Sequence, residues 1–243
     1  MKTIKLNAID STNSFLKDLA LNMEVENFTV VVTNQQLKGR GQQGSSWVSE
    51  SFKSLIFSVF VLFKELNILD SRYLNFAVSL AIFEALNEES IPGISIKWPN
   101  DILSGNKKLC GILIENSFKS GEISSSVIGI GLNVNQTGFP RSLKKVSSLK
   151  LLSNKDFNLE KLLESIVSKL KVKIEMLDSK DFKTLEAEYL KVLYRKNIPT
   201  MFKNSQDVLF MGIISGISKE GKLQIALEDD SIQEFGIKEV SFL

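Results

Sequence analysis

The sequence has no histidine, one cysteine and four prolines among its 243 residues. The absence of histidine removes the commonest general base, the commonest zinc ligand and the serine–histidine and cysteine–histidine nucleophile pairs. Any chemistry must therefore use lysine, arginine, carboxylates or a bound metal. The lone Cys110 excludes an intrachain disulfide and fits a reducing compartment. Because it lies in an apolar run, we expect a buried structural thiol rather than the alternative, a nucleophile.

Long apolar segments are also missing. No stretch approaches the roughly 20 apolar residues that span a bilayer, and segment 1–10 has no apolar signal-peptide core. We therefore expect a cytoplasmic protein without a membrane partner. The net charge is only +2 and no run of basic residues occurs, so the composition does not indicate a nucleic-acid-binding face. With 43% hydrophobic residues, the chain is long enough for one sizeable domain and a small appendage.

The residue patterns predict an α+β fold, with helices packed against a mixed β-sheet. Apolar residues at helical spacing indicate helices, and β-branched apolar runs indicate strands. Predicted helices cover residues 12–22, 72–88, 158–177 and 181–195, and predicted strands cover 28–32, 55–63, 94–96, 107–115 and 125–134. Short β-like runs at 208–214, 223–227 and 232–235 indicate a small β domain over residues 197–243, after a first domain of residues 1–196.

A polar segment at 39–47, Gly-Arg-Gly-Gln-Gln-Gly-Ser-Ser-Trp, has three glycines that let backbone N–H groups approach an anion closely. Arg40 adds a planar fork suited to phosphate or carboxylate. The segment is typical of a mobile phosphate-binding loop. The alternative is a flexible surface loop on which Trp47 merely packs.

A second polar segment at 97–101, Lys-Trp-Pro-Asn-Asp, follows the predicted strand 94–96. The neighbouring indole and proline predict that the ammonium of Lys97 is held in place rather than left mobile in solvent. A fixed cation near a phosphate loop indicates acyl-phosphate chemistry. The alternative is an ordinary exposed lysine at a strand end.

With these segments the sequence resembles the biotin protein ligases. The motifs of that family occur in the same order at residues 11–13, 36–47, 97–101, 108–115 and 129–133. One glycine-rich motif alone would be weak, since such loops also occur in dinucleotide sites. The resemblance is close over residues 9–150 and looser beyond them.

The resemblance implies a catalytic domain with a seven-stranded sheet, related to class II tRNA synthetases, followed by a small SH3-like β-barrel. It implies a biotin–[biotin carboxyl-carrier protein] ligase. Such an enzyme uses ATP and Mg²⁺ to activate biotin as biotinyl-AMP, and then transfers biotin to a lysine of a carrier protein. The implied partner is the biotin carboxyl carrier protein of acetyl-CoA carboxylase or of a related carboxylase. The identity of that carboxylase stays open, as does the choice between monomer and homodimer.

Carried over residue by residue, the resemblance implies that Lys97 and Arg40 are catalytic. The implied biotin-binding residues are Ser11, Thr12, Asn13, Gln36, Gly39, Arg40, Gly41, Trp47, Lys97, Gly111 and Ile112. The implied nucleotide-binding residues are Arg40, Gln42, Trp47, Asn100, Lys108 and Asn133. Asp101 is expected to organise Lys97 or to bind Mg²⁺, with a turn cap as the alternative, and Glu115 is expected to be structural.

The resemblance also implies how the loop acts. The amides of Gly39, Gly41 and Gly44 are expected to face the phosphates or the biotin carboxylate. Trp47 is expected to fold over the ligand or a lysine stem as the loop closes. The missing side chain of Gly111 is expected to let the ligand approach the sheet.

Two departures from the family matter. Gln42 and Ser45 stand where the family usually has arginines, so two phosphate-directed charges are absent, for which Lys38 or Lys53 could substitute. The chain also begins at the catalytic domain without the winged helix of the family's repressors, so DNA binding is not expected. Two alternatives stay open: a lipoate or octanoate transferase, although the histidine of their motif is absent, and a non-catalytic sensor, although Lys97 and Arg40 are retained.

Overall fold

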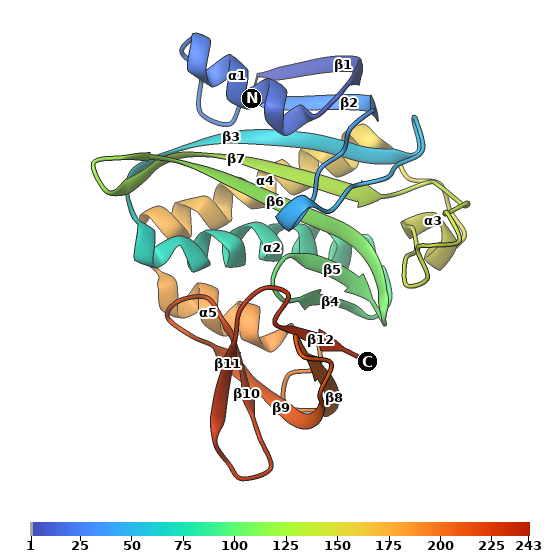
Figure 1. Cartoon of the computed structure of the whole chain (residues 1–243). Helices are drawn as coiled ribbons and strands as arrows, with labels where there is room; N and C mark the ends of the chain where they lie inside the picture. The colour runs from blue at the N-terminus through green and yellow to red at the C-terminus, as the bar shows by residue number, and fades with distance from the viewer. Residues whose placement is uncertain (1) are drawn as a thin grey trace.

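The computed structural model describes residues 2–243. Its larger layer is a seven-stranded sheet in the order β1-β2-β3-β7-β6-β5-β4 (Figure 1). The neighbours β1 and β2 pair in parallel and the remaining neighbours pair antiparallel. Its strands are β1 (Thr3–Ile9), β2 (Val30–Gln36), β3 (Ser54–Asn67), β4 (Ile94–Lys97), β5 (Asp101–Ser104), β6 (Lys107–Lys119) and β7 (Glu122–Asn133). The expectation of seven strands in this sheet is confirmed.

Helices cover both faces of this sheet. The helices are α1 (Thr12–Asn22), α2 (Ser71–Glu88), α3 (Leu149–Ser153), α4 (Leu159–Asp178) and α5 (Phe182–Lys191). Side chains of a strand alternate between its two faces. In β3, Phe57 and Val59 pack with α2 and α4, whereas Phe60 packs with Leu16 of α1. The prediction of helices packed against a mixed β-sheet is therefore confirmed.

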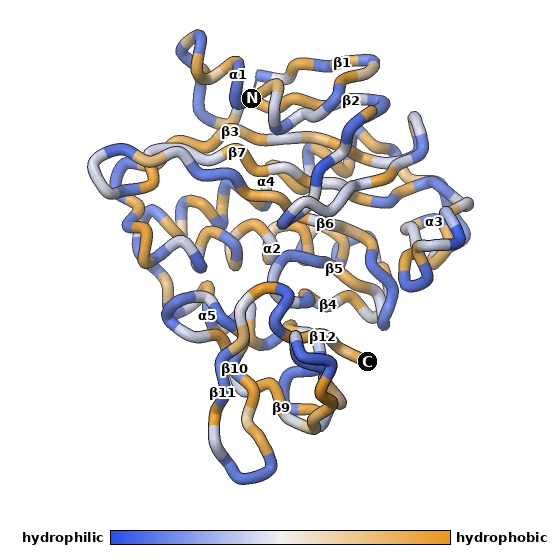
Figure 2. The backbone as a smooth tube through the Cα atoms, viewed as in Figure 1, coloured by the Kyte–Doolittle hydropathy of each residue, from blue (hydrophilic) through white to orange (hydrophobic). Residues whose placement is uncertain are grey.

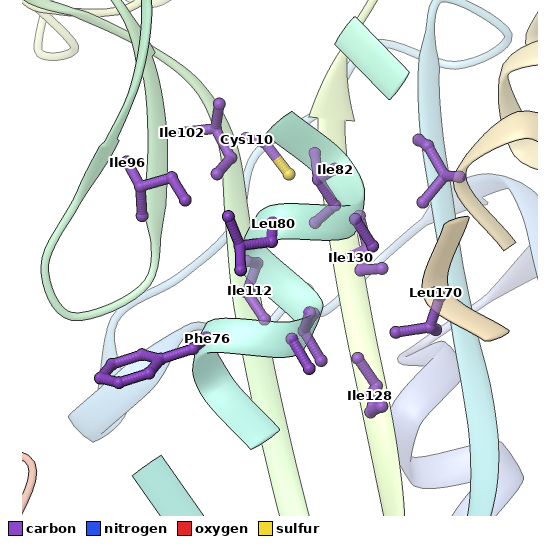
Figure 3. Packing of buried hydrophobic residues seen from close by; sticks show 14 of the residues in the cluster. Phe76, Leu80, Ile82, Ile96, Ile102, Cys110, Ile112, Ile128, Ile130 and Leu170 are labelled. Carbon is purple, nitrogen blue, oxygen red and sulfur yellow. The ribbon is translucent and has the colours of Figure 1, made fainter. Parts of the chain in front are cut away.

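The main core lies between the sheet and α2. This helix is apolar almost all round and is buried along most of its length, as predicted. Figure 3 shows Leu80 and Ile82 of α2 beside Ile112 and Ile130 of the sheet, together with Cys110. Burial raises the pKa of the Cys110 thiol well above its usual range, so the interpretation as a structural cysteine is supported.

The C-terminal part of the chain forms a second, five-stranded antiparallel sheet in the order β11-β10-β9-β8-β12. Its strands are β8 (Pro199–Asn204), β9 (Leu209–Ile217), β10 (Leu223–Ala226), β11 (Ile232–Phe235) and β12 (Val240–Phe242). Within the described residues β11 and β12 are the two edges, so the sheet is open and a closed barrel is not confirmed.

The two sheets share one core. Phe202 and Leu223 of the second sheet belong to the same buried cluster as the side chains under the first sheet. The indole N–H of Trp98 donates a hydrogen bond of 2.9 Å to the carbonyl of Gly221. Figure 1 shows β12 near β4, the edge strand, and the ammonium of Lys97 in β4 lies 4.8 Å from the centre of the Phe242 ring in β12. The end of the chain therefore returns to the edge of the first sheet.

Several predicted elements have different bounds in the structure, and tertiary pairing explains two of the differences. The helix predicted over 181–195 ends at Lys191, because the amide of Ile96 bonds to the carbonyl of Val192 and the amide of Tyr194 bonds to the carbonyl of Ile96. The strand predicted over 28–32 is instead Val30–Gln36, because its polar half pairs with β1. Neither of these tertiary pairings leaves a local sequence pattern.

The predictions did not include β1, β5, β8, β12 and α3. β1 is an edge strand in which every residue is exposed or of intermediate exposure, so it lacks the apolar run of a central strand. Figure 2 shows the contrast between the apolar β3 and β7 and the hydrophilic loop that connects β2 and β3. None of the helices within residues 2–243 has the length and apolar character needed to cross a membrane.

Candidate functional site

A cavity of about 460 Å³ lies on the face of the first sheet that carries α1. Such a volume suits a small organic ligand. Its walls come from the start of α1, the β2–β3 loop, the ends of β4 to β7, and the segment 237–242 that contains β12. Of the site residues that the sequence predicts, the cavity brings together Ser11, Thr12, Asn13, Gln36, Arg40, Gly41, Gln42, Trp47, Lys97, Asn100, Asp101, Lys108, Gly111 and Ile112. Gly39 and Asn133 do not line it.

One end of the cavity is neutral and polar. Ser11 caps α1, with its hydroxyl accepting from the amide of Ser14, which places Thr12 and Asn13 at the helix start. The amide of Thr12 donates to Gln36 Oε1 at 3.0 Å. The Ser58 hydroxyl lies 2.7 Å from Thr12 Oγ1 and 2.6 Å from Asn13 Oδ1. These contacts hold a group of hydroxyls and amides in fixed orientations.

The floor of this end depends on a glycine. A Cβ atom at Gly129 would lie 2.2 Å from Asn13 Oδ1. Only a residue without a side chain therefore lets Asn13 lie against β7. The Asn13 amide nitrogen in turn donates to the carbonyl of Leu113 at 3.2 Å and to Glu115 Oε2 at 2.9 Å.

The loop of residues 39–47, here called the glycine loop, is a small hairpin. The amide of Gly41 donates to the carbonyl of Ser45 at 2.7 Å, and the amide of Trp47 donates to the carbonyl of Gly39 at 2.9 Å. Arg40 and Ser46 form a β-bridge between the two arms. The Gly41 amide, expected from the sequence to face an anion, is used in this structure by the loop itself.

Trp47, the last residue of the glycine loop, packs its indole on the sheet. A Cβ atom at Gly131 would be 2.5 Å from the indole, and one at Gly111 would be 3.1 Å from it. The ammonium of Lys108 lies 5.6 Å from the centre of a Trp47 ring, within the range of a cation–π contact. The strand glycines thus admit the indole, and Gly111, expected to face a ligand, also contacts Trp47.

Arg40 is held by a carboxylate. Its Nη2 atom lies 3.0 Å from Glu115 Oε2, and Lys17 Nζ lies 3.0 Å from Glu115 Oε1. Burial acts to raise the pKa of the Glu115 carboxyl, but hydrogen bonds from Asn13 and Lys17 and the charge of Arg40 outweigh it, so the pKa lies below its usual range. Glu115, expected to be structural, therefore connects Arg40 to the polar end of the cavity.

Lys97 lies at the end of β4, as predicted, and is partly buried. Its Nζ atom lies 4.8 Å from the centre of the Phe242 ring of β12. Burial lowers the pKa of the ammonium; the Asp101 carboxylate acts in the opposite direction, and Lys108 and Lys145 add to the lowering. Lys97 is thus a restrained cation in a poorly solvated place.

Asp101 is paired with Lys108, whose Nζ atom lies 2.7 Å from its Oδ1 atom. Within residues 2–243, no cluster of three or more aspartate, glutamate, cysteine or histidine side chains is arranged to hold a metal ion. Asp101 is the sole carboxylate among the described residues that line the cavity. The described part of the cavity wall therefore offers Mg²⁺ at most one carboxylate, and Lys108 already pairs with it.

The two predicted asparagines have different positions. Asn100 lines the cavity, and its amide nitrogen donates to the carbonyl of Ile112, which ties the 97–101 turn to β6. Asn133 is buried at the end of β7, opposite Ser54, and its Oδ1 atom has no hydrogen-bond partner in the part of the chain that the structure describes. The Trp98–Pro99 peptide bond in the turn is cis.

Sequence patterns missed several residues of the site. Ser58 is a polar residue inside an apolar strand, and that break in the pattern was a usable signal. β12 and the turn before it also contribute to the wall, and their sequence gave no such signal. These residues are Ile237, Lys238, Val240, Ser241 and Phe242. They lie more than a hundred residues from every other part of the cavity wall.

Residues 6–133, just over half of the chain, match the model of the biotin/lipoate A/B protein ligase family. The chain is 33% identical over 142 residues to the bifunctional ligase/repressor BirA of Bacillus subtilis, a match that covers 58% of this chain and 43% of that protein. It is 32% identical over 127 residues to the biotin–[acetyl-CoA-carboxylase] ligase of Paracoccus denitrificans, covering 51% of each. The chain therefore spans about half the length of these two relatives.

A solved structure covers more of the chain. The biotin protein ligase from Aquifex aeolicus in complex with biotin and ATP superposes with a TM-score of 0.81 at 28% sequence identity. This superposition covers 100% of this chain and 98% of that one. The likeness therefore includes the C-terminal sheet, which lies outside the segment that matches the family model.

Proposed function

The chain belongs to the biotin/lipoate A/B protein ligase family, and we propose that it is a biotin protein ligase. In this proposal it joins biotin to AMP at the expense of ATP and then transfers biotin to a lysine of a biotin carboxyl carrier protein. The observation that carries the proposal is the cavity of about 460 Å³, whose walls combine the neutral polar groups at the start of α1 with the cations Arg40, Lys97, Lys108 and Lys238.

The polar end fits the ureido ring of biotin. That ring has two N–H donors and one carbonyl acceptor, and Thr12, Asn13 and Gln36 supply oriented hydroxyl and amide groups. Trp47 and Ile112 provide apolar surface beside this end. The valeryl chain of biotin would then direct its carboxylate toward the cations that line the cavity, among which Arg40 lies beside the polar end.

In the first step, a carboxylate oxygen of biotin attacks the α-phosphorus of ATP. The bond from that phosphorus to the oxygen that bridges to the β-phosphate breaks, and pyrophosphate leaves with the electron pair. In the second step, the neutral amine of the carrier lysine attacks the acyl carbon; AMP leaves, the nitrogen loses a proton, and an amide forms. Both steps develop negative charge on phosphate oxygens, which a fixed cation stabilises.

Lys97 and Arg40 are the proposed catalytic residues. The ammonium of Lys97 lies against the Phe242 ring and is partly buried, so it is oriented before the substrates arrive. Arg40 is held by Glu115 beside the polar end, where its fork can receive the biotin carboxylate or a phosphate. We propose that Gln42, Trp47, Asn100 and Lys108 bind the nucleotide. Gly39, proposed to bind biotin, and Asn133, proposed to bind the nucleotide, do not line the cavity.

These residues do not form a ready Mg²⁺ site, because the carboxylate of Asp101 is paired with Lys108. Magnesium bound by few protein carboxylates commonly relies on the substrate phosphates for its remaining contacts. The proposed roles of Lys97 and Arg40 do not depend on a protein-held metal.

The remaining proposals concern organisation and partners. We propose a division into a catalytic domain of residues 1–196 and a small domain of residues 197–243 that corresponds to an SH3-like barrel. We propose the biotin carboxyl carrier protein of acetyl-CoA carboxylase or of a related carboxylase as the partner, because a relative bears the name biotin–[acetyl-CoA-carboxylase] ligase. A cytoplasmic location, the absence of a DNA partner and a homodimer remain proposals from the sequence and the family.

One experiment tests the function. The protein is incubated with ATP, Mg²⁺, biotin and a biotin carboxyl carrier domain, and the carrier is probed with streptavidin. A parallel reaction contains lipoate in place of biotin, and its carrier is analysed by mass spectrometry. Biotinylation of the carrier lysine is expected; lipoylation instead, or no transfer from folded protein that binds ATP, would overturn the proposal.

A further inference from the structure

Four cationic side chains line the cavity, and two of them are already neutralised. Arg40 pairs with Glu115 at 3.0 Å, and Lys108 pairs with Asp101 at 2.7 Å. Within residues 2–243, the other two, Lys97 and Lys238, form no ion pair with a carboxylate. An anion that enters the cavity therefore meets two cations whose charge is not cancelled by a direct partner.

The glycine loop itself provides little charge. After Arg40, residues 41–47 contain glycine, glutamine, serine and tryptophan but no charged side chain. The triphosphate of ATP carries several negative charges, and binding of such a group depends on nearby cations. A cation for the tip of this loop must therefore come from elsewhere in the chain.

Neither of the two lysines that flank the loop in sequence fills this role. Lys38 forms a pair of 2.8 Å with Asp10 on the surface, and neither Lys38 nor Lys53 lines the cavity. Their positions therefore do not support the expectation that one of them substitutes for a loop arginine. Lys238, which lies 195 positions after Gln43, donates a hydrogen bond of 2.8 Å from its ammonium to the carbonyl of Gln43 at the loop tip.

A tight turn presents Lys238 to the loop. The amide of Glu239 bonds to the carbonyl of Gly236 at 3.1 Å, and the Glu239 carboxylate accepts from the Gly236 amide at 2.6 Å. Lys238 has a φ of 67°, in the left-handed region that favours glycine. The backbone position would suit glycine, yet it carries a lysine whose side chain reaches the glycine loop.

We propose that Lys238, in the turn between β11 and β12, supplies the cation that the glycine loop lacks, and that it binds the phosphates of ATP and of the acyl-adenylate. This assignment rests on the proposed function for the identity of the nucleotide. When phosphate binds, the ammonium exchanges its contact with the neutral Gln43 carbonyl for a stronger one with a charged oxygen. The same side chain fastens the C-terminal sheet to the loop, so the two parts of the chain close on the nucleotide together.

Three substitutions test the assignment through binding of α,β-methylene-ATP, an analogue that cannot be cleaved at the α-phosphorus. Lys238→Gln removes the charge and should weaken binding roughly tenfold, by less at high salt. Lys238→Arg should retain most of the affinity. Lys238→Gly should lose as much affinity for the analogue as Lys238→Gln does. Its melting temperature should stay the same or rise, because glycine adopts the turn without strain. Biotin affinity should stay unchanged in all three.

A surface lysine in another turn of the C-terminal part, between β9 and β10, provides the control. Lys219 is exposed, forms no ion pair within the described residues and does not line the cavity. Lys219→Gln should leave nucleotide affinity and its salt dependence unchanged. Equal losses in Lys219→Gln and Lys238→Gln would indicate a general charge effect and would overturn the assignment.

A double substitution tests whether Lys238 replaces a loop cation. Gln42→Arg places a guanidinium on the loop, so in its presence Lys238→Gln should cost less than about threefold in nucleotide affinity. Additive effects would show that the two positions act independently and would contradict the assignment.

The outcomes also separate the assignment from the proposed function. If wild type biotinylates the carrier but Lys238→Gln binds the analogue as tightly as wild type does, the role of Lys238 is refuted and the proposed function stands. Analogue binding that depends on Lys238, without biotin transfer to any carrier, would refute the proposed function and support Lys238.

Discussion

At the scale of single residues, the environment of Lys97 differs from that of an ordinary strand-end lysine. Its ammonium faces the ring of Phe242 and is partly buried, and burial lowers its pKa while Asp101 opposes that change. A cation in such a place is poorly solvated, so it interacts more strongly with a developing negative charge than an exposed lysine does. The proposed catalytic role depends on this preorganisation.

Lys97→Ala should nearly abolish adenylate formation and leave the fold intact, because it removes a charge needed mainly in the transition state. Loss of one preorganised donor costs about 10²–10³ in rate. The measurement is ATP–pyrophosphate exchange that depends on biotin, with circular dichroism as the check on folding. A variant that keeps more than about a tenth of the wild-type rate would exclude this role.

Asp101→Asn should shift the alkaline limb of the pH–rate profile to lower pH. Lys97 must be protonated to act, so activity falls as the pH rises through its lowered pKa. Asp101 raises that pKa, and removal of its charge therefore lets the ammonium lose its proton at a lower pH.

The control for this pH shift is Asp10→Asn, since Asp10 pairs with Lys38 on the surface and does not line the cavity. Its profile should coincide with that of wild type. An unchanged alkaline limb in Asp101→Asn would mean that a group other than Lys97 limits the rate at high pH.

At the scale of elements, the glycines of β6 and β7 serve contacts within the protein. Gly111 and Gly131 leave room for the indole of Trp47, and Gly129 leaves room for Asn13. The glycine loop is thereby seated on the sheet, with Arg40 fastened by Glu115 and Gln43 by Lys238. The loop thus has three anchors that come from distant parts of the chain.

Gly131→Ala should displace Trp47 from the sheet, because its Cβ atom would lie 2.5 Å from the indole. Overpacking of this kind costs about 1–3 kcal/mol, so biotin affinity should fall by roughly tenfold if the seated loop forms the site. Acrylamide quenching of tryptophan fluorescence reports the displacement and calorimetry reports the affinity. Gly138→Ala is the matched control, since a Cβ atom there meets nothing within 4 Å; identical quenching in both variants would contradict the predicted displacement.

At the scale of the whole molecule, the C-terminal sheet completes both the core and the cavity. Phe202 and Leu223 lie in the main core, and Trp98 bonds to Gly221. Phe242 covers Lys97 and Lys238 reaches the glycine loop. The two proposed domains therefore do not form independent halves.

Truncation after residue 196 should lower the melting temperature of the remaining chain and remove most of the carrier biotinylation. It exposes the buried Trp98, leaves its indole N–H without an acceptor, and uncovers Lys97. Deletion of Leu243 alone, an exposed residue, is the control and should change little. A truncated chain with wild-type stability and activity would show that the C-terminal sheet is a separate unit.

Much of the fold and of the site could be predicted from the sequence. The helix at 12–22 and the apolar strands carry local patterns, because their periodicity reflects one buried face. The two polar segments stand out for a different reason: glycine-rich and lysine–tryptophan–proline sequences are unusual for either core or surface. Most residues predicted for the site line one cavity, although Gly39 and Asn133 do not.

The sequence by itself determined which side chains are available: a loop with one arginine, a lysine at a strand end, polar groups at a helix start, and no histidine. The tertiary structure alone decided which of them act together. It paired Arg40 with Glu115, placed Phe242 over Lys97 and brought Lys238 to the glycine loop. These contacts join residues 75 to 195 positions apart, and their energy comes from packing and charge in three dimensions, which impose no periodic or local pattern on the chain.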